Sequence, residues 1–230
     1  MDTTVKGYIV RFIKLIVGLA IGSFGVMFTI NANLGLSPWD VFAQGIAVKV
    51  SAAMGTEVLL GTIIQIVGVF VLLIVILLKE KIGVGTLCDI LVFGQFMNIY
   101  TKLGVVPTPQ TLPMRLMFLF IGFSIWSIGV YVYMSAGLGA GPRDSLMAAL
   151  TKRNIPVSLA KNGTEAVVLL IGFLLGGQVG IGTVVAVFIM GYMLKIVFGI
   201  FDFDIKTVHN DSVVETVMNL KKTLTKVPQE

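Results

Sequence analysis

The chain repeats a block of its own sequence, and this duplication limits the folds open to it. Residues 11–40 match residues 115–144 at a constant offset of 104 without a gap, and twelve of the thirty positions are identical. A second block follows in each half, where four residues recur: Gly83, Gly85, Thr86 and Gly94 return as Gly180, Gly182, Thr183 and Gly191. A chain duplicated in this way is expected to fold into two similar halves.

The composition places both halves in a membrane. Hydrophobic residues make up 56% of the 230 residues and charged residues 13%, and the mean hydropathy is +0.96. A soluble domain carries about 25% charged residues, and a chain of this size cannot bury so many long apolar runs in one core. The sequence therefore predicts an all-α, polytopic membrane protein that contacts the lipid bilayer.

Charge and cysteine content exclude several other classes. The net charge of +5 comes from basic residues beside the apolar runs, a pattern typical of membrane topology and not of nucleic-acid binding. The single cysteine, Cys88, excludes an intramolecular disulfide and a cysteine metal cluster. We therefore expect no nucleic-acid partner.

Six apolar runs have the length of membrane spans: residues 8–32, 57–78, 84–102, 114–136, 159–176 and 181–201. The first follows a basic start but is longer than the apolar core of a signal peptide, so we predict a retained span. Two segments, 38–50 and 142–153, are too short to cross about 30 Å of hydrocarbon and are predicted as half-helices.

The orientation of the halves depends on these two short segments. If they do not span, each half has three spans and the repeats are inverted; if they span, the repeats are parallel. Six spans place Lys79, Lys81 and Arg143 on the inside, whereas eight spans move them outside. The positive-inside rule therefore favours six spans, inverted repeats and cytoplasmic termini.

This topology divides the chain into four parts: a cytoplasmic N-terminus (1–7), a first membrane repeat (8–104), a second repeat (112–201) and a cytoplasmic tail (202–230). In the tail, Ser212 and Glu215 have the spacing of a capping box. Apolar residues then recur at helical spacing at Val213, Val217, Leu220 and Leu224, among several lysines. Two interpretations stay open: a basic amphipathic helix on the membrane surface, and a frayed soluble tail.

The clearest candidate site is a paired motif. Gly35, Pro38 and Asp40 in the first half correspond to Gly139, Pro142 and Asp144 in the second half. Glycine allows a sharp turn, proline suits the first position of a helix, and aspartate complements a helix N-terminus. Each motif is expected to end a span and start a short helix. The favoured interpretation is that both aspartates only cap their helices at the membrane surface, and the alternative is that the two helix starts face a central cavity.

Polar residues inside the predicted spans are further candidates, because ionisable groups in hydrocarbon mark ion or substrate paths. Glu165, Asp89 and Gln65 are the candidates for binding a substrate or protons; for Glu165 the alternative is an ion pair with Lys161, one helical turn earlier. Asn31, Asn33 and Asn98 are expected to bridge helices. The glycines at 18, 22, 25, 122 and 129 predict close helix packing.

Enzymatic motifs are missing from the sequence. The single histidine, His209, lies in the tail, and the sequence contains no HExxH, GxSxG, Walker or dinucleotide-binding pattern. We therefore expect no metal, no cofactor and no enzymatic activity, with an intramembrane enzyme that uses carboxylates alone as the remaining enzymatic alternative.

The motifs GLSPWD and GLGAGPRD, with GVGT and GIGT opening later spans, resemble the YczE/YyaS/YitT group of bacterial integral membrane proteins. The resemblance covers residues 8–201 and implies a bacterial inner-membrane protein, without implying a biochemical activity. In such proteins an acidic residue is expected at Glu165, where the first half offers Gln65.

The duplicated, interrupted helices favour a secondary transporter or permease for an unidentified small solute, with protons as a further cargo. A non-transporting membrane accessory or regulatory protein is the alternative. The glycine stripes are compatible with a monomer or a homo-oligomer.

Overall fold

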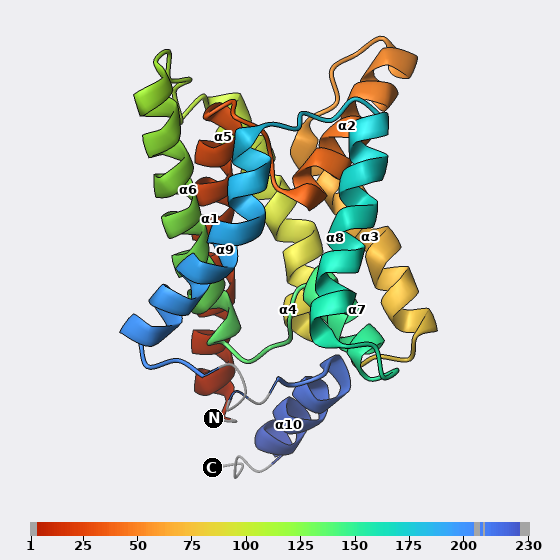
Figure 1. The fold of residues 1–230 in the computed structure, drawn as a ribbon. Helices are drawn as coiled ribbons and strands as arrows, with labels where there is room; N and C mark the ends of the chain where they lie inside the picture. Colours follow the sequence, from red (N-terminus) through yellow and green to blue (C-terminus); the bar gives the residue numbers. More distant parts are fainter. Residues whose placement is uncertain (1–3, 205–207, 209, 226–230) are drawn as a thin grey trace.

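The computed structural model describes residues 4–204, 208 and 210–225, and its regular structure there is helical apart from one isolated bridge (Figure 1). His209 and the last residues of the tail lie outside this part. Within the described residues, four helices are long and apolar enough to cross a membrane: α1 (Val5–Asn31), α3 (Leu60–Leu77), α6 (Leu112–Met134) and α9 (Ile181–Ile200). Each coincides with a predicted span.

The predicted span at 84–102 is not one regular helix. It consists of α4 (Val84–Cys88), a π-helical turn at Asp89–Phe93, and α5 (Gly94–Leu103). Gln65 of α3 donates a hydrogen bond to the Leu91 carbonyl within this turn, at 2.6 Å. A π turn inserts an extra residue and disturbs the regular backbone hydrogen bonds of the helix. The Gln65 side chain therefore supplies a hydrogen-bond donor to a carbonyl in this turn. The hydrophobic periodicity of the sequence did not predict the turn.

The two short segments differ from each other in length. The first, α2, runs over Pro38–Met54 and is longer than the predicted 38–50, whereas α7 covers Pro142–Thr151. At 1.5 Å per residue, α2 is about 26 Å long and α7 about 15 Å. The predicted span at 159–176 corresponds to α8 (Val157–Leu174), which is a helix but not one of the four candidate spans, and α2 packs along it.

The most extensive helix packing is the antiparallel pair of α1 and α6, which carry the duplicated block and lie side by side at the left of Figure 1. Glycines make the close approach possible. A Cβ atom on Gly18 would lie 2.8 Å from Tyr133 Cα, and one on Gly25 would lie 2.7 Å from the Gly122 carbonyl. The predicted role of these glycines in helix packing is confirmed.

Many large apolar side chains cover the outside of the helices. Phe70, Leu77, Leu174 and Phe188 are each more than half exposed. Side chains of this kind on spanning helices face lipid, because the bilayer replaces water as their solvent. The exposed apolar surface therefore agrees with a membrane protein.

The tail helix α10 (Val213–Thr225) lies at the same end of the molecule as the N-terminus (Figure 1). The predicted capping box is confirmed: the Ser212 N–H donates to Glu215 Oε2 at 2.8 Å, and the Glu215 N–H donates to Ser212 Oγ at 3.2 Å. Leu220 packs against a buried cluster of the helical body, whereas Val217 is exposed. The predicted apolar stripe is therefore divided between protein and surroundings, because one side of α10 docks on the helical body.

Candidate functional site

The two glycine motifs that precede α2 and α7 each contact the opposite half of the chain. The Gly182 N–H donates to the Leu34 carbonyl, and the Gly85 N–H donates to the Leu138 carbonyl, both at 2.7 Å. These four residues are the repeated ones, because Leu34 corresponds to Leu138 and Gly85 to Gly182. Each half therefore holds the turn of the other half with the same hydrogen bond.

Both turns require glycine. Gly35 has a φ of +106° and Gly139 a φ of +114°, which side-chain-bearing residues rarely adopt. A Cβ atom on Gly139 would also lie 2.6 Å from Gly83 Cα, and one on Gly35 would lie 2.6 Å from Thr183 Oγ1. The tight crossing places the start of α2 and the start of α7 inside the molecule.

The helices begin at Pro38 and Pro142, as predicted, with an aspartate in each first turn. The aspartates bind side chains. Asp40 accepts a hydrogen bond from Ser37 Oγ at 2.6 Å and pairs with Arg143 at 3.7 Å, and Asp144 accepts one from the Tyr133 hydroxyl at 3.3 Å. Their interactions extend beyond helix capping, since Arg143 and Tyr133 come from other segments than the aspartate they contact.

A cavity of about 140 Å³ opens beside these residues. Its polar lining comes from Asp89 in the π turn, Tyr133 on α6, and Arg143 and Asp144 on α7. Trp126 and Phe93 add aromatic surface, and Gly18 and Gly22 of α1 form a wall without side chains. The cavity is thus enclosed by both halves of the chain.

Two carboxylates converge on one point of this cavity. A Cβ atom on Gly141 would lie 2.9 Å from Asp89 Oδ2 and 3.8 Å from Asp144 Oδ2. Arg143 also lines the cavity, and its guanidinium pairs with Asp40 and lies 5.1 Å from the centre of the Trp39 ring. Two carboxylates and one guanidinium therefore meet at the cavity.

Arg143 and Trp39 occupy corresponding positions of the two repeats. Their contact therefore joins one repeat position to itself, as a contact on a two-fold axis does. The packing of α1 on α6 is reciprocal, as contacts around a two-fold axis are. Gly18 meets Tyr133 and its counterpart Gly122 meets Thr29, the counterpart of Tyr133. The cavity residues thus lie beside the point where corresponding positions meet.

The remaining predicted residues lie apart from the cavity. Glu165 is half-buried on α8 and does not line it. Gln65 binds the π turn. Asn98 Nδ2 donates to Thr62 Oγ1 at 2.9 Å and so bridges α5 to α3, as expected for an intramembrane asparagine.

Sequence reasoning missed Tyr133 and Arg143 as site residues. Arg143 had a signal, since it is a charged residue within the second copy of the motif. Tyr133 had no such signal in the sequence, because it replaces Thr29 in the repeat and lies among apolar residues of a predicted span. Within the described residues, no group of three or more His, Cys, Asp or Glu side chains is placed to hold a metal ion.

Comparison with known proteins identifies the family. The family of unknown function DUF6198 matches residues 9–198, which is most of the chain. The chain belongs to this family. The match runs from within α1 to within α9 and therefore includes the paired motifs and the cavity, whereas α10 lies outside it.

Curated relatives of the DUF6198 protein are bacterial. An uncharacterized protein of Haemophilus influenzae is 36% identical over 171 residues, which cover 74% of this chain and 75% of the relative. The uncharacterized membrane protein YczE of Bacillus subtilis is 32% identical over 190 residues, covering 81% and 85%. YyaS of the same organism is 26% identical over 189 residues, covering 78% and 88%. The resemblance to YczE and YyaS is confirmed. No solved structure matches the chain.

Proposed function

We propose that this membrane protein is a secondary transporter of the bacterial cytoplasmic membrane that carries a small cation through the central cavity. In this proposal the molecule has six spans in two inverted halves, with both termini in the cytoplasm. α2 and α7 are the half-helices of the two repeats, and the activity is transport and not catalysis.

The antiparallel packing of α1 and α6 supports the inverted arrangement. Helices that carry the same repeat and run in opposite directions are related by an axis perpendicular to them, which lies in the membrane plane. Transporters built from inverted repeats bind their substrates near the midplane, where interrupted helices meet. In this proposal the contact between Arg143 and Trp39 marks the corresponding place in the molecule.

The convergence of Asp89 and Asp144 on one point of the cavity carries the proposal. Two carboxylates beside a single guanidinium are costly in hydrocarbon, and a bound cation would offset this cost. Trp126 and Phe93 add ring surface that attracts cations. A cavity of about 150 Å³ holds one benzene molecule, so this one fits a solute of about six non-hydrogen atoms.

Both tryptophans of the chain lie at the site, which provides a direct binding assay. Trp126 lines the cavity and Trp39 contacts Arg143. We expect guanidinium or tetramethylammonium to change the tryptophan fluorescence of the purified protein with a saturable profile. Asp89→Asn should weaken this binding about 10- to 100-fold, because it removes a charged partner. Glu57→Gln changes an exposed carboxylate outside the cavity and should leave binding unchanged.

Transport is tested with the same variants in proteoliposomes under an imposed inside-negative potential. Wild-type protein and Glu57→Gln should take up guanidinium, and Asp89→Asn should not. Sulfate serves as the anionic control and should stay outside. Equal cation uptake by wild type and Asp89→Asn, or uptake of sulfate in preference to both cations, would refute the proposal.

A further inference from the structure

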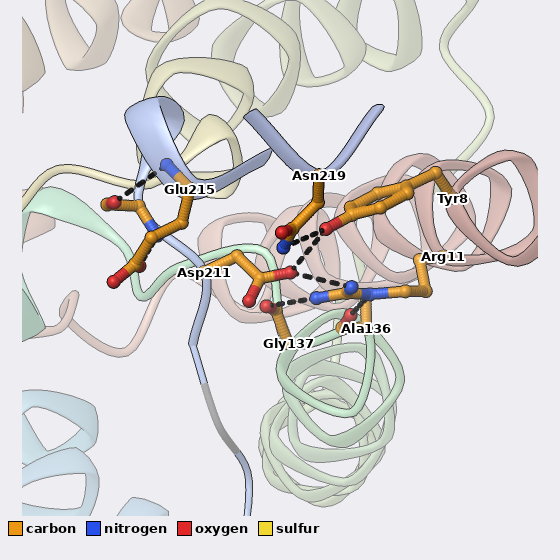
Figure 2. Close-up of polar contacts among 8 residues, drawn as sticks. Tyr8, Arg11, Ala136, Gly137, Asp211, Glu215 and Asn219 are labelled. Atoms are coloured by element: carbon orange, nitrogen blue, oxygen red, sulfur yellow. Dashed lines mark hydrogen bonds and ion pairs between the residues drawn. The ribbon is translucent and has the colours of Figure 1, made fainter. Parts of the chain in front are cut away.

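The start of the tail makes a buried ion pair with the first helix (Figure 2). Asp211 Oδ2 lies 2.7 Å from Arg11 Nη1, and both side chains are less than a tenth exposed. The Tyr8 hydroxyl donates a hydrogen bond to the same oxygen at 3.0 Å, and Asn219 of α10 donates one to that hydroxyl at 3.2 Å. One carboxylate therefore joins the tail to α1.

The same cluster holds the connection between α6 and α7. Arg11 Nε donates to the Ala136 carbonyl at 2.7 Å, and Arg11 Nη2 donates to the Gly137 carbonyl at 2.5 Å. The Asp211 N–H donates to the Gly137 carbonyl as well, at 3.0 Å. Figure 2 shows these groups around the guanidinium. This connection leads directly to Gly139, whose turn places Arg143 and Asp144 at the cavity.

Further contacts join the tail to the segment before α4. The Val213 N–H donates to the Ile82 carbonyl at 2.9 Å, and Ser212 forms an antiparallel bridge with Gly83. Lys81 pairs with Glu215 at 3.2 Å. Because Gly83 also packs against Gly139, the tail contacts both of the chain segments that meet at these two glycines.

An apolar layer lies between α10 and the cavity. Leu220 of α10 and Cys88 of α4 pack against a buried cluster that includes Tyr8 and Leu138. Three other members of this cluster, Leu19, Val130 and Tyr133, also line the cavity. The same buried cluster therefore contacts both the tail and the cavity.

We propose that residues 211–225 form a latch that keeps the cavity closed at the end of the molecule carrying the N-terminus. The latch binds the α6–α7 connection through Gly137 and the segment before α4 through Ile82 and Gly83. Release of Asp211 from Arg11 and Tyr8 frees both segments, and the layer beneath Leu220 then opens. The closure itself is independent of the cargo, whereas its role in regulating uptake rests on the proposed transport function.

The single cysteine is a built-in reporter of this opening. In detergent-solubilised protein, the rate at which a hydrophilic maleimide labels Cys88 should follow the population of the opened state. We expect Asp211→Asn to accelerate labelling about tenfold or more. Tyr8→Phe removes a single hydroxyl and should accelerate it about two- to tenfold. Asp202→Asn makes the same carboxylate-to-amide change at the exposed end of α9 and should label at the wild-type rate.

Two outcomes would overturn the latch. The first is that Asp211→Asn and Tyr8→Phe both label at the wild-type rate while retaining native circular dichroism. The second is that Asp202→Asn accelerates labelling as much as Asp211→Asn does. Guanidinium uptake by the same variants separates the two proposals: accelerated labelling without any uptake by wild-type protein leaves the latch standing and contradicts the transport function.

Discussion

Two glycines at the contact between α1 and α6 should respond very differently to the same substitution. Gly22 and Gly129 face each other, yet their missing side chains point in different directions. A Cβ atom on Gly129 would lie 2.5 Å from Gly22 Cα and 2.8 Å from the Gly18 carbonyl. A Cβ atom on Gly22 would lie 3.5 Å from Phe93 Cε2 and 3.9 Å from Gly129 Cα, which is ordinary contact.

These distances set the size of the difference. Alanine at 129 must move the helices apart by about 1 Å, and a gap of that size forfeits a quarter to a half of each dispersion contact along the interface. Overpacking of this kind costs about 1–3 kcal/mol. The gain in helix propensity on replacing glycine by alanine is about 1 kcal/mol at both positions and cancels in the comparison. We expect Gly129→Ala to be less stable than Gly22→Ala by about 2 kcal/mol.

The free energy of unfolding can be measured by titrating the purified protein with a denaturing detergent in mixed micelles, with helicity from circular dichroism as the signal. Gly22→Ala is the matched control, because it places the same methyl group on the same interface. If the two variants differ by less than about 0.5 kcal/mol, or Gly22→Ala is the less stable one, the packing argued here for α1 and α6 is wrong.

Two further predictions concern the tail and the topology. Hydrogen bonds from the Ser212 backbone and side chain, and the nearby Lys81, lower the pKa of Glu215 from 4.5 to about 2. Because the folded pKa is depressed, this carboxylate stabilises the docked tail fully above about pH 4.5, and the contribution is lost as the pH falls toward 2. The rate of hydrogen exchange in α10 should therefore rise over that pH window in the wild-type protein relative to Glu215→Gln. Identical pH profiles for the two proteins would contradict this role of Glu215. For the inverted halves, single cysteines at Lys49 and Lys152 in a Cys88→Ala background should differ toward an impermeant thiol reagent on intact cells: labelling at 49 alone is expected, and labelling at both would indicate parallel halves.

Local sequence rules sufficed for the starts of α2 and α7. Pro38 and Pro142 start helices because proline fits a first helical turn, and Gly35 and Gly139 mark the preceding turns because those turns need a positive φ. The membrane class followed from the scarcity of charge and from apolar runs of span length. The family resemblance followed from the same motifs, because they lie within the matched residues 9–198.

The candidate site was only partly predictable. Asp40 and Asp144 stood out through the repeated motif and Asp89 because a carboxylate in an apolar run is unusual, and the structure brings Asp89 and Asp144 to one cavity. Glu165 stood out for the same reason, yet it lies outside the cavity lining. A hydropathy profile shows that a charged residue lies within a helix, but it does not show which neighbouring helix or cavity the charged side chain faces.

By itself, therefore, the sequence determined the class of protein, the duplicated helices and the turns between them, because these depend on solvent preference and on backbone rules that act over a few residues. The tertiary structure alone decided which half holds each glycine turn, where Arg143 and Tyr133 lie, and that Asp211 closes the tail onto Arg11. Those contacts join segments up to about two hundred residues apart. They exist because glycine-lined helices can approach closely enough to bring such segments together, and no periodicity within either segment encodes its partner.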